Sequence, residues 1–178
     1  AGLAPKPIFV VSHQNELSAE IARVAPRVVL VSTFSHPAGA FTKSWRVPAL
    51  ARLVVTRLKA ERVDLVVTLL SHVWTPLIVP YLRRAGIAHA TIVHDWAPHP
   101  GDPTALVNRW LLRHVPRDHA VITLSRNVGE ALRRKPGMAN VPITELFHPN
   151  LSYGNRAEPR RLPFAQPFRL LFLGRILA

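Results

Sequence analysis

Polar side chains that can form hydrogen bonds follow five apolar stretches of this 178-residue sequence, at 12–15, 32–33, 71–72, 94–95 and 124–126. If these stretches are parallel strands, their carboxyl ends share one edge of a sheet, and open α/β folds bind ligands at that edge. A hydroxyl-rich or phosphorylated ligand fits the groups gathered there. The ligand-binding candidates are His13, His72, Asp95, Ser125 and Arg126.

His94, followed directly by Asp95, is the most informative of these positions. An imidazole beside a carboxylate can donate hydrogen bonds to a sugar or stabilise developing charge, so His94 is the candidate catalytic residue. The alternative is that Asp95 caps a turn and that His94 is a buried, hydrogen-bonded histidine. His94 and His99 lack a third imidazole or a carboxylate placed on one face with them, and the sequence therefore predicts no metal site.

Ser125 stands where a helix begins after the apolar stretch 119–124. It is expected to cap that helix, and the exposed amide groups of the first turn could instead hold an anion. A glycine-rich phosphate fingerprint follows none of the expected strands, which disfavours dinucleotide binding.

The elements that would position these groups alternate along the chain. Apolar, β-branched stretches predict strands at 7–12, 27–32, 64–70, 90–94, 119–124 and 143–147. Helical spacing predicts helices at 15–25, 47–62, 75–84, 104–114 and 125–135, while 33–45 is expected to be a loop. This order predicts an α/β fold, a Rossmann-like open parallel sheet with helices on both faces.

The last part of the chain breaks that alternation. Residues 148–167 contain four prolines and no apolar period, so they are expected to link the domain 1–147 to a second domain. Residues 168–178 have the pattern of one more strand, and the sequence stops before a helix that could cover it. We expect this strand to be the first of a truncated second domain.

Composition narrows the class of protein. The hydrophobic share of 48% excludes a disordered chain, and the absence of cysteine excludes disulfides, thiolate metal sites and cysteine nucleophiles. No signal peptide is evident at the start. Residues 63–82 have the length of a membrane span, but a strand followed by a proline-containing helix fits them better, and we expect a cytoplasmic protein.

The net charge of +13 favours anionic partners such as lipid headgroups, sugar phosphates or nucleic acid, although an arginine-rich composition also fits a GC-rich genome. In the expected helix 47–62 the apolar residues form one stripe, and Arg52, Lys59 and Arg62 lie off it. These cations form either a solvated face or a patch for an anionic membrane surface. No nucleic-acid-binding motif is present, so nucleic acid is not expected as a partner.

Several segments together resemble a two-domain GT-B glycosyltransferase of the group 1, family 4 type. They are VITLSRNVGEAL (121–132), TIVHD (91–95) with PHPGD (98–102), FHPN (147–150) and LLFLGRI (170–176). The resemblance implies a retaining, metal-independent transfer of a hexose from a UDP- or GDP-linked sugar, without a further cofactor. The acceptor would be a carbohydrate or a lipid-linked sugar at the inner face of the plasma membrane, in polysaccharide or glycolipid synthesis.

The resemblance also implies roles for single residues. His94 would lie near the transferred sugar, Ser125 and Arg126 would face the cleft, and Gly174 and Arg175 would match the Gly-Arg motif that approaches the donor phosphates. The loop 12–16 lacks the glycine pair common in the family. The rest of the donor site lies beyond Ala178, so we expect this chain alone to be inactive. The alternative function is a non-enzymatic Rossmann-like module that binds a phosphorylated or anionic partner.

Overall fold

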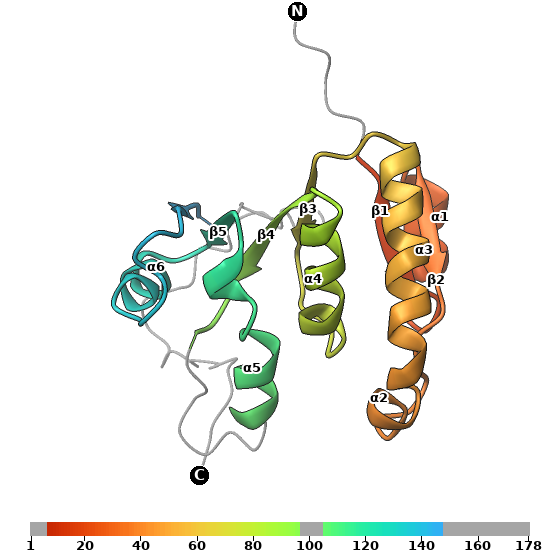
Figure 1. Cartoon of the computed structure of the whole chain (residues 1–178), viewed down its shortest axis with the longest axis horizontal. Coiled ribbons are helices and arrows are strands. Elements are labelled where there is room, and N and C mark those ends of the chain that lie inside the picture. The colour runs from red at the N-terminus through yellow and green to blue at the C-terminus, as the bar shows by residue number, and fades with distance from the viewer. Residues whose placement is uncertain (1–6, 97–104, 148–178) are drawn as a thin grey trace, which may run out of the picture.

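The computed structural model describes residues 7–96 and 105–147, which form the alternating helices and strands seen in Figure 1. In chain order the elements are β1 (Phe9–Ser12), α1 (Ser18–Val24), β2 (Val28–Val31), α2 (Gly39–Thr42), the 3-10 helix η1 (Ser44–Arg46), α3 (Val47–Ala60), β3 (Leu65–Thr68), α4 (Thr75–Arg84), β4 (Ala88–Val93), α5 (Ala105–Leu111), the 3-10 helix η2 (Val115–Arg117), β5 (Ala120–Thr123), α6 (Arg126–Arg133) and β6 (Ile143–Glu145).

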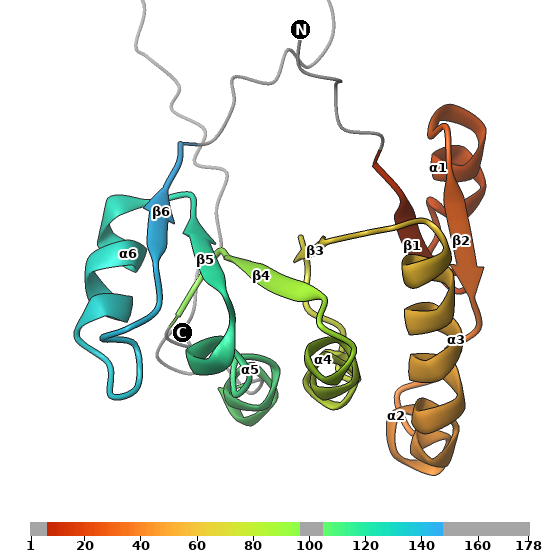
Figure 2. The ribbon, with the colours of Figure 1, turned by 45° about the horizontal axis from the view of Figure 1, so that its top comes forward.

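All the strand pairs are parallel, as the alternating pattern predicts, but they form two hydrogen-bonded sheets where one was expected. β1 pairs with β2, and the second sheet has the order β3-β4-β5-β6. Figure 2 shows β1 facing β3, so that the strands run β2, β1, β3, β4, β5, β6 across the molecule. The chain therefore changes direction between β1 and β3, where open α/β sheets form their binding crevice.

Side-chain packing joins the two sheets where backbone hydrogen bonds do not. One core cluster contains Val31 of β2, Val54 and Leu58 of α3, and Leu82 and Ile87 at the end of α4 and just beyond it. α3 thus packs directly against α4 across the seam between the sheets. Burial of this apolar surface holds the halves together, at roughly 25 cal/mol for each Å² removed from water.

A second core lies under the other end of the larger sheet. Val93 and Val121 of neighbouring strands pack with Val115, with Leu132 of α6, and with Met138. It shares no residue with the first core.

The sequence pattern of α3 is confirmed, with one unusual feature at its end. Its buried residues Val47, Ala51, Val54 and Leu58 form a single stripe. The helix ends at Ala60, and just beyond it Arg62 adopts a left-handed conformation with a φ of 53° while the Val63 N–H donates to the carbonyl of Leu58 at 2.9 Å. This is the closing bond of a helix end at which glycine is the usual residue.

Two expectations for the connecting segments need correction or fall outside the described residues. The stretch 33–45, expected as a loop, contains α2 and the start of η1. These helices are too short to show an apolar period in the sequence, so the pattern did not predict them. The expected linker 148–167, the strand 168–178, Gly174, Arg175 and His99 lie outside the described residues. Within the described part of the chain, no helix combines the length and apolarity that crossing a membrane requires.

Candidate functional site

The loops that follow β1 and β2 are locked together by side-chain hydrogen bonds. The hydroxyls of Ser12 and Thr33 lie 2.8 Å apart, and the Gln14 side-chain oxygen accepts the Thr33 N–H at 2.8 Å. The His13 side chain is exposed on this loop, and the backbone N–H of His13 donates to the carbonyl of Val31 at 2.8 Å. The first two strand ends therefore form one rigid platform that presents His13 to solvent.

An aromatic cluster connects this platform to the loop after β3, across the seam between the two sheets. The ring of Phe34 lies 5.1 Å from that of His72 and 5.2 Å from that of Trp74, centroid to centroid. Trp74 is only 2% exposed, whereas Phe34 and His72 are partly exposed. The cluster offers aromatic faces of the kind that line ligand sites.

The hydrogen bonds around His72 define its tautomer. Its Nδ1 accepts the backbone N–H of Trp74 at 3.1 Å, so the proton of the neutral ring is on Nε2. Burial lowers the pKa of His72, because removal from water disfavours the charged ring. His72 is therefore a neutral hydrogen-bond donor near pH 7.

His94 lies at the same edge, directly after β4. Its side chain is exposed, and Nε2 lies 3.2 Å from the carbonyl oxygen of Leu69. Because a carbonyl can only accept, Nε2 carries the proton and donates it, which fixes the plane of the ring. Asp95 is also exposed. Neither residue is buried. The alternative that His94 is a buried histidine is therefore wrong, although its ring is hydrogen-bonded.

Ser125 and Arg126 follow the neighbouring strand end. Val93 pairs with Thr123, so His94 and Ser125 leave adjacent strands, which are about 4.8 Å apart. Ser125 occupies the N-cap position of α6 with extended backbone, but its hydroxyl makes no capping hydrogen bond, contrary to expectation. Instead the Ser125 carbonyl accepts the N–H of Gly129 at 3.1 Å, and Arg126 is exposed.

The contacts thus place the predicted candidates His13, His72 and His94 along one continuous edge, with Ser125 and Arg126 at the next strand end. Sequence reasoning missed Phe34 and Trp74, which connect the loops. Both stand one or two positions beyond the polar candidates at the strand ends, and aromatic residues next to such groups would have been the signal.

Exposed basic and aromatic side chains also occur in the segment that runs from α2 to just beyond α3. Arg52, Lys59 and Arg62 are all exposed, and residues 33–60 contain no aspartate or glutamate. Two large aromatic side chains also face solvent here: Phe41 is 84% exposed and Trp45 is 77% exposed.

Comparison with known proteins identifies a family. Residues 7–146, most of the chain, match the family model described as Glycosyltransferase Family 4. No curated protein and no solved structure matches the chain.

Proposed function

The chain belongs to Glycosyltransferase Family 4, as an N-terminal domain of the GT-B type, and we propose that it forms the acceptor side of a retaining hexosyltransferase. The donor is a UDP- or GDP-linked hexose, and the acceptor is a carbohydrate or a lipid-linked sugar. The reacting centre needs neither a metal nor a further cofactor. Cell-surface polysaccharide or glycolipid synthesis is the process that this chemistry serves.

One observation carries the proposal: His94 stands exposed at the carboxyl end of β4 with its ring held by the Leu69 carbonyl. An imidazole fixed in this way can bind a hydroxyl of the transferred hexose and stabilise charge as the donor bond breaks. A preorganised ring needs no reorientation at the moment of transfer, which is the condition for a useful contribution to the rate.

The rest of the edge suits an acceptor sugar. The partly exposed rings of Phe34 and His72 offer an apolar face against which a pyranose can pack, and His13, Asp95, Ser125 and Arg126 offer polar groups along the same edge. Gly174 and Arg175 would contact the donor diphosphate from the second domain, by analogy with the family motif.

We also propose that the enzyme works as a peripheral protein at the cytoplasmic face of the plasma membrane. Arg52, Lys59 and Arg62 supply positive charge for anionic headgroups, and Phe41 and Trp45 supply exposed rings for the interfacial layer. This placement would bring the carboxyl edge close to a lipid-linked acceptor.

The function is tested on the complete product of the gene, purified and assayed with UDP- and GDP-linked hexoses and membrane extracts that contain acceptors. We expect sugar incorporation from one donor class and its loss by at least tenfold in His94→Ala. His36→Gln, which alters another exposed histidine, serves as the control. Binding of an anionic partner without any sugar transfer would favour the non-enzymatic module and overturn the proposal.

A further inference from the structure

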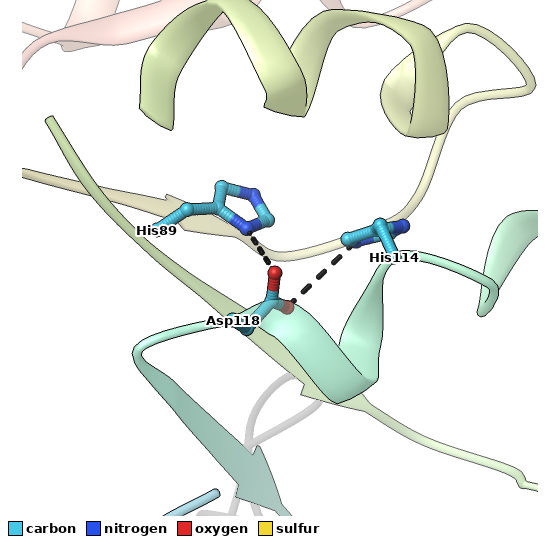
Figure 3. Close-up of side chains that lie close together, drawn as sticks. All are labelled: His89, His114 and Asp118. Atoms are coloured by element: carbon cyan, nitrogen blue, oxygen red, sulfur yellow. Dashed lines mark hydrogen bonds and ion pairs between the residues drawn. The ribbon is translucent and has the colours of Figure 1, made fainter. Parts of the chain in front are cut away.

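Two histidines and an aspartate meet in the interior of the larger sheet, away from the carboxyl edge. His89 Nδ1 lies 2.8 Å from Asp118 Oδ1, and His114 Nε2 lies 3.8 Å from Asp118 Oδ2. In Figure 3 the two imidazoles flank the carboxylate. All three side chains are buried: His89 is 1% exposed, His114 5% and the Asp118 side chain 0%.

One ring nitrogen of this cluster, His114 Nδ1, has no hydrogen-bond partner. The single hydroxyl proton of Thr91 faces two acceptors, Asp118 Oδ2 at 2.6 Å and His114 Nε2 at 3.1 Å. If Thr91 donates to Asp118, His114 must hold its own proton on Nε2, which leaves Nδ1 as an acceptor. That Nδ1 is buried and has no hydrogen-bond partner.

We propose that His89 Nδ1, His114 Nε2 and the Asp118 carboxylate bind a divalent transition metal of the zinc class. Two imidazoles and one carboxylate are a common zinc ligand set. Their ligand atoms all lie within 4.8 Å of one another. Ligands on a tetrahedral zinc ion with bonds of about 2.0–2.1 Å are separated by roughly 3.3 Å, and the distances of 2.8 Å and 3.8 Å to Asp118 lie on either side of that value.

The surrounding groups fit this assignment. A metal ion at His114 Nε2 would leave the ring proton on Nδ1, the atom that otherwise has no partner. Metal at His89 Nδ1 leaves a proton on Nε2 for Thr68 Oγ1, which is 2.9 Å away. Thr91 still donates to Asp118 Oδ2. His89 and Asp118 would then each keep an outer hydrogen bond of the kind that holds metal ligands in orientation.

The position of the cluster gives the ion a structural role. His89 is the second residue of β4 and Asp118 precedes β5, so the cluster lies toward the amino ends of these strands. Five residues of extended chain, about 16 Å, separate His89 from His94. The ion would tie β4 to the segment between α5 and β5 and take no part in sugar transfer, so this inference stands apart from the proposed function.

This cluster is hard to find from the sequence, since 29 positions separate His89 from Asp118. Only the pairing of β4 with β5 brings them together.

The test measures metal in the complete gene product after chelation, reloading with ZnCl2 and gel filtration. We expect about one zinc per chain by elemental analysis, as for a structural site, and a Tm that rises with free zinc but not with magnesium. CoCl2 should give the visible absorption of a tetrahedral Co²⁺ complex with nitrogen and oxygen ligands, a readout that needs no variant.

His114→Gln and Asp118→Asn should lose zinc retention and the cobalt spectrum, whereas the control His36→Gln should keep both. Zinc held equally by the wild type and His114→Gln would overturn the proposal. So would a reloaded wild type that retains no zinc and whose Tm does not change with zinc, because the cluster would then be a hydrogen-bonded network alone.

Discussion

The indole N–H of Trp74 donates a hydrogen bond of 2.8 Å to the carbonyl oxygen of Ala40. Trp74 follows β3 and Ala40 lies in α2, so this bond connects the loops of the two hydrogen-bonded sheets. Trp74 is 2% exposed and Ala40 is partly exposed, so the buried indole supplies this carbonyl with a hydrogen bond from inside the protein. The edge that carries the candidate site depends on this contact.

Trp74→Phe should therefore destabilise the protein by about 1–3 kcal/mol, because it removes this hydrogen bond and leaves the Ala40 carbonyl without its partner. Urea unfolding followed by circular dichroism measures the change. Trp45→Phe is the matched control, since Trp45 is 77% exposed and its replacement should change stability little. Equal effects of the two substitutions would contradict the role given to the Trp74 bond.

Gly39→Ala should disturb the aromatic cluster. A Cβ at position 39 would lie 2.6 Å from the Cβ of Phe34, a distance that forces Phe34 to move. Alanine otherwise favours a helix, so a loss of about 1–3 kcal/mol, typical of overpacking, would identify the clash as the cause. The Tm of Gly39→Ala is compared with that of Ser35→Ala, a substitution at an exposed position. A higher Tm for Gly39→Ala than for the wild type would contradict the close packing of Gly39 against Phe34.

His72 predicts a pH dependence of stability. Burial lowers its pKa below the ordinary value of about 6.5, so the unfolded chain takes up a proton at a higher pH than the folded chain. Protonation of His72 therefore does not affect the free energy of unfolding above pH 6.5. As the pH falls from 6.5 toward the lowered pKa, the unfolded chain is protonated first and the folded protein loses stability. His72→Asn keeps an acceptor for the Trp74 N–H and cannot titrate. The free energy of unfolding, measured from pH 7.5 to pH 5, should fall more steeply for the wild type than for this variant.

Two substitutions, one in α3 and one just beyond its end, remove the same charge but should change stability in opposite directions. Arg62 has a φ of 53°, which glycine adopts without strain, so Arg62→Gly should stabilise the protein by about 1 kcal/mol. Arg52→Gly removes the same charge from the helix interior and should destabilise it by about 1 kcal/mol. Denaturant titration of both variants gives the two signs, and a destabilised Arg62→Gly would argue against the left-handed helix end.

The membrane proposal predicts how the protein binds lipid vesicles. The complete gene product should sediment with vesicles that contain phosphatidylglycerol and much less with phosphatidylcholine alone, and the binding should weaken as salt is added. Phe41→Ser with Trp45→Ser should reduce binding several-fold, since interfacial aromatic rings supply the apolar part. Leu106→Ser, a change at a 79% exposed apolar residue on another helix, is the control. Binding indifferent to anionic lipid would exclude this surface as the anchor.

Local sequence signals predicted the elements of this fold well and its long-range contacts poorly. The helix Thr75–Arg84 has the predicted bounds, because Pro76 favours its start and Gly86 permits its end. The place of His94 directly after β4 was predicted because the end of a buried strand is visible in the pattern. The separation of β1 from β3 and the meeting of Phe34 with His72 depend on packing between distant segments, which periodicity does not encode.

The two separate cores have a consequence for how the molecule opens. Between β1 and β3 there is no ladder bond within the described sheets, so the two sheets are joined there by side-chain contacts, mainly those of α3 with α4 and of Trp74 with the α2 region. Amide hydrogens of β4 and β5 should exchange only on global unfolding, while those of β1 and β2 exchange through a smaller opening of the seam. A slide of α3 along α4 would then widen the edge between His13 and His94 and admit bulkier substrates while every strand pair stays intact.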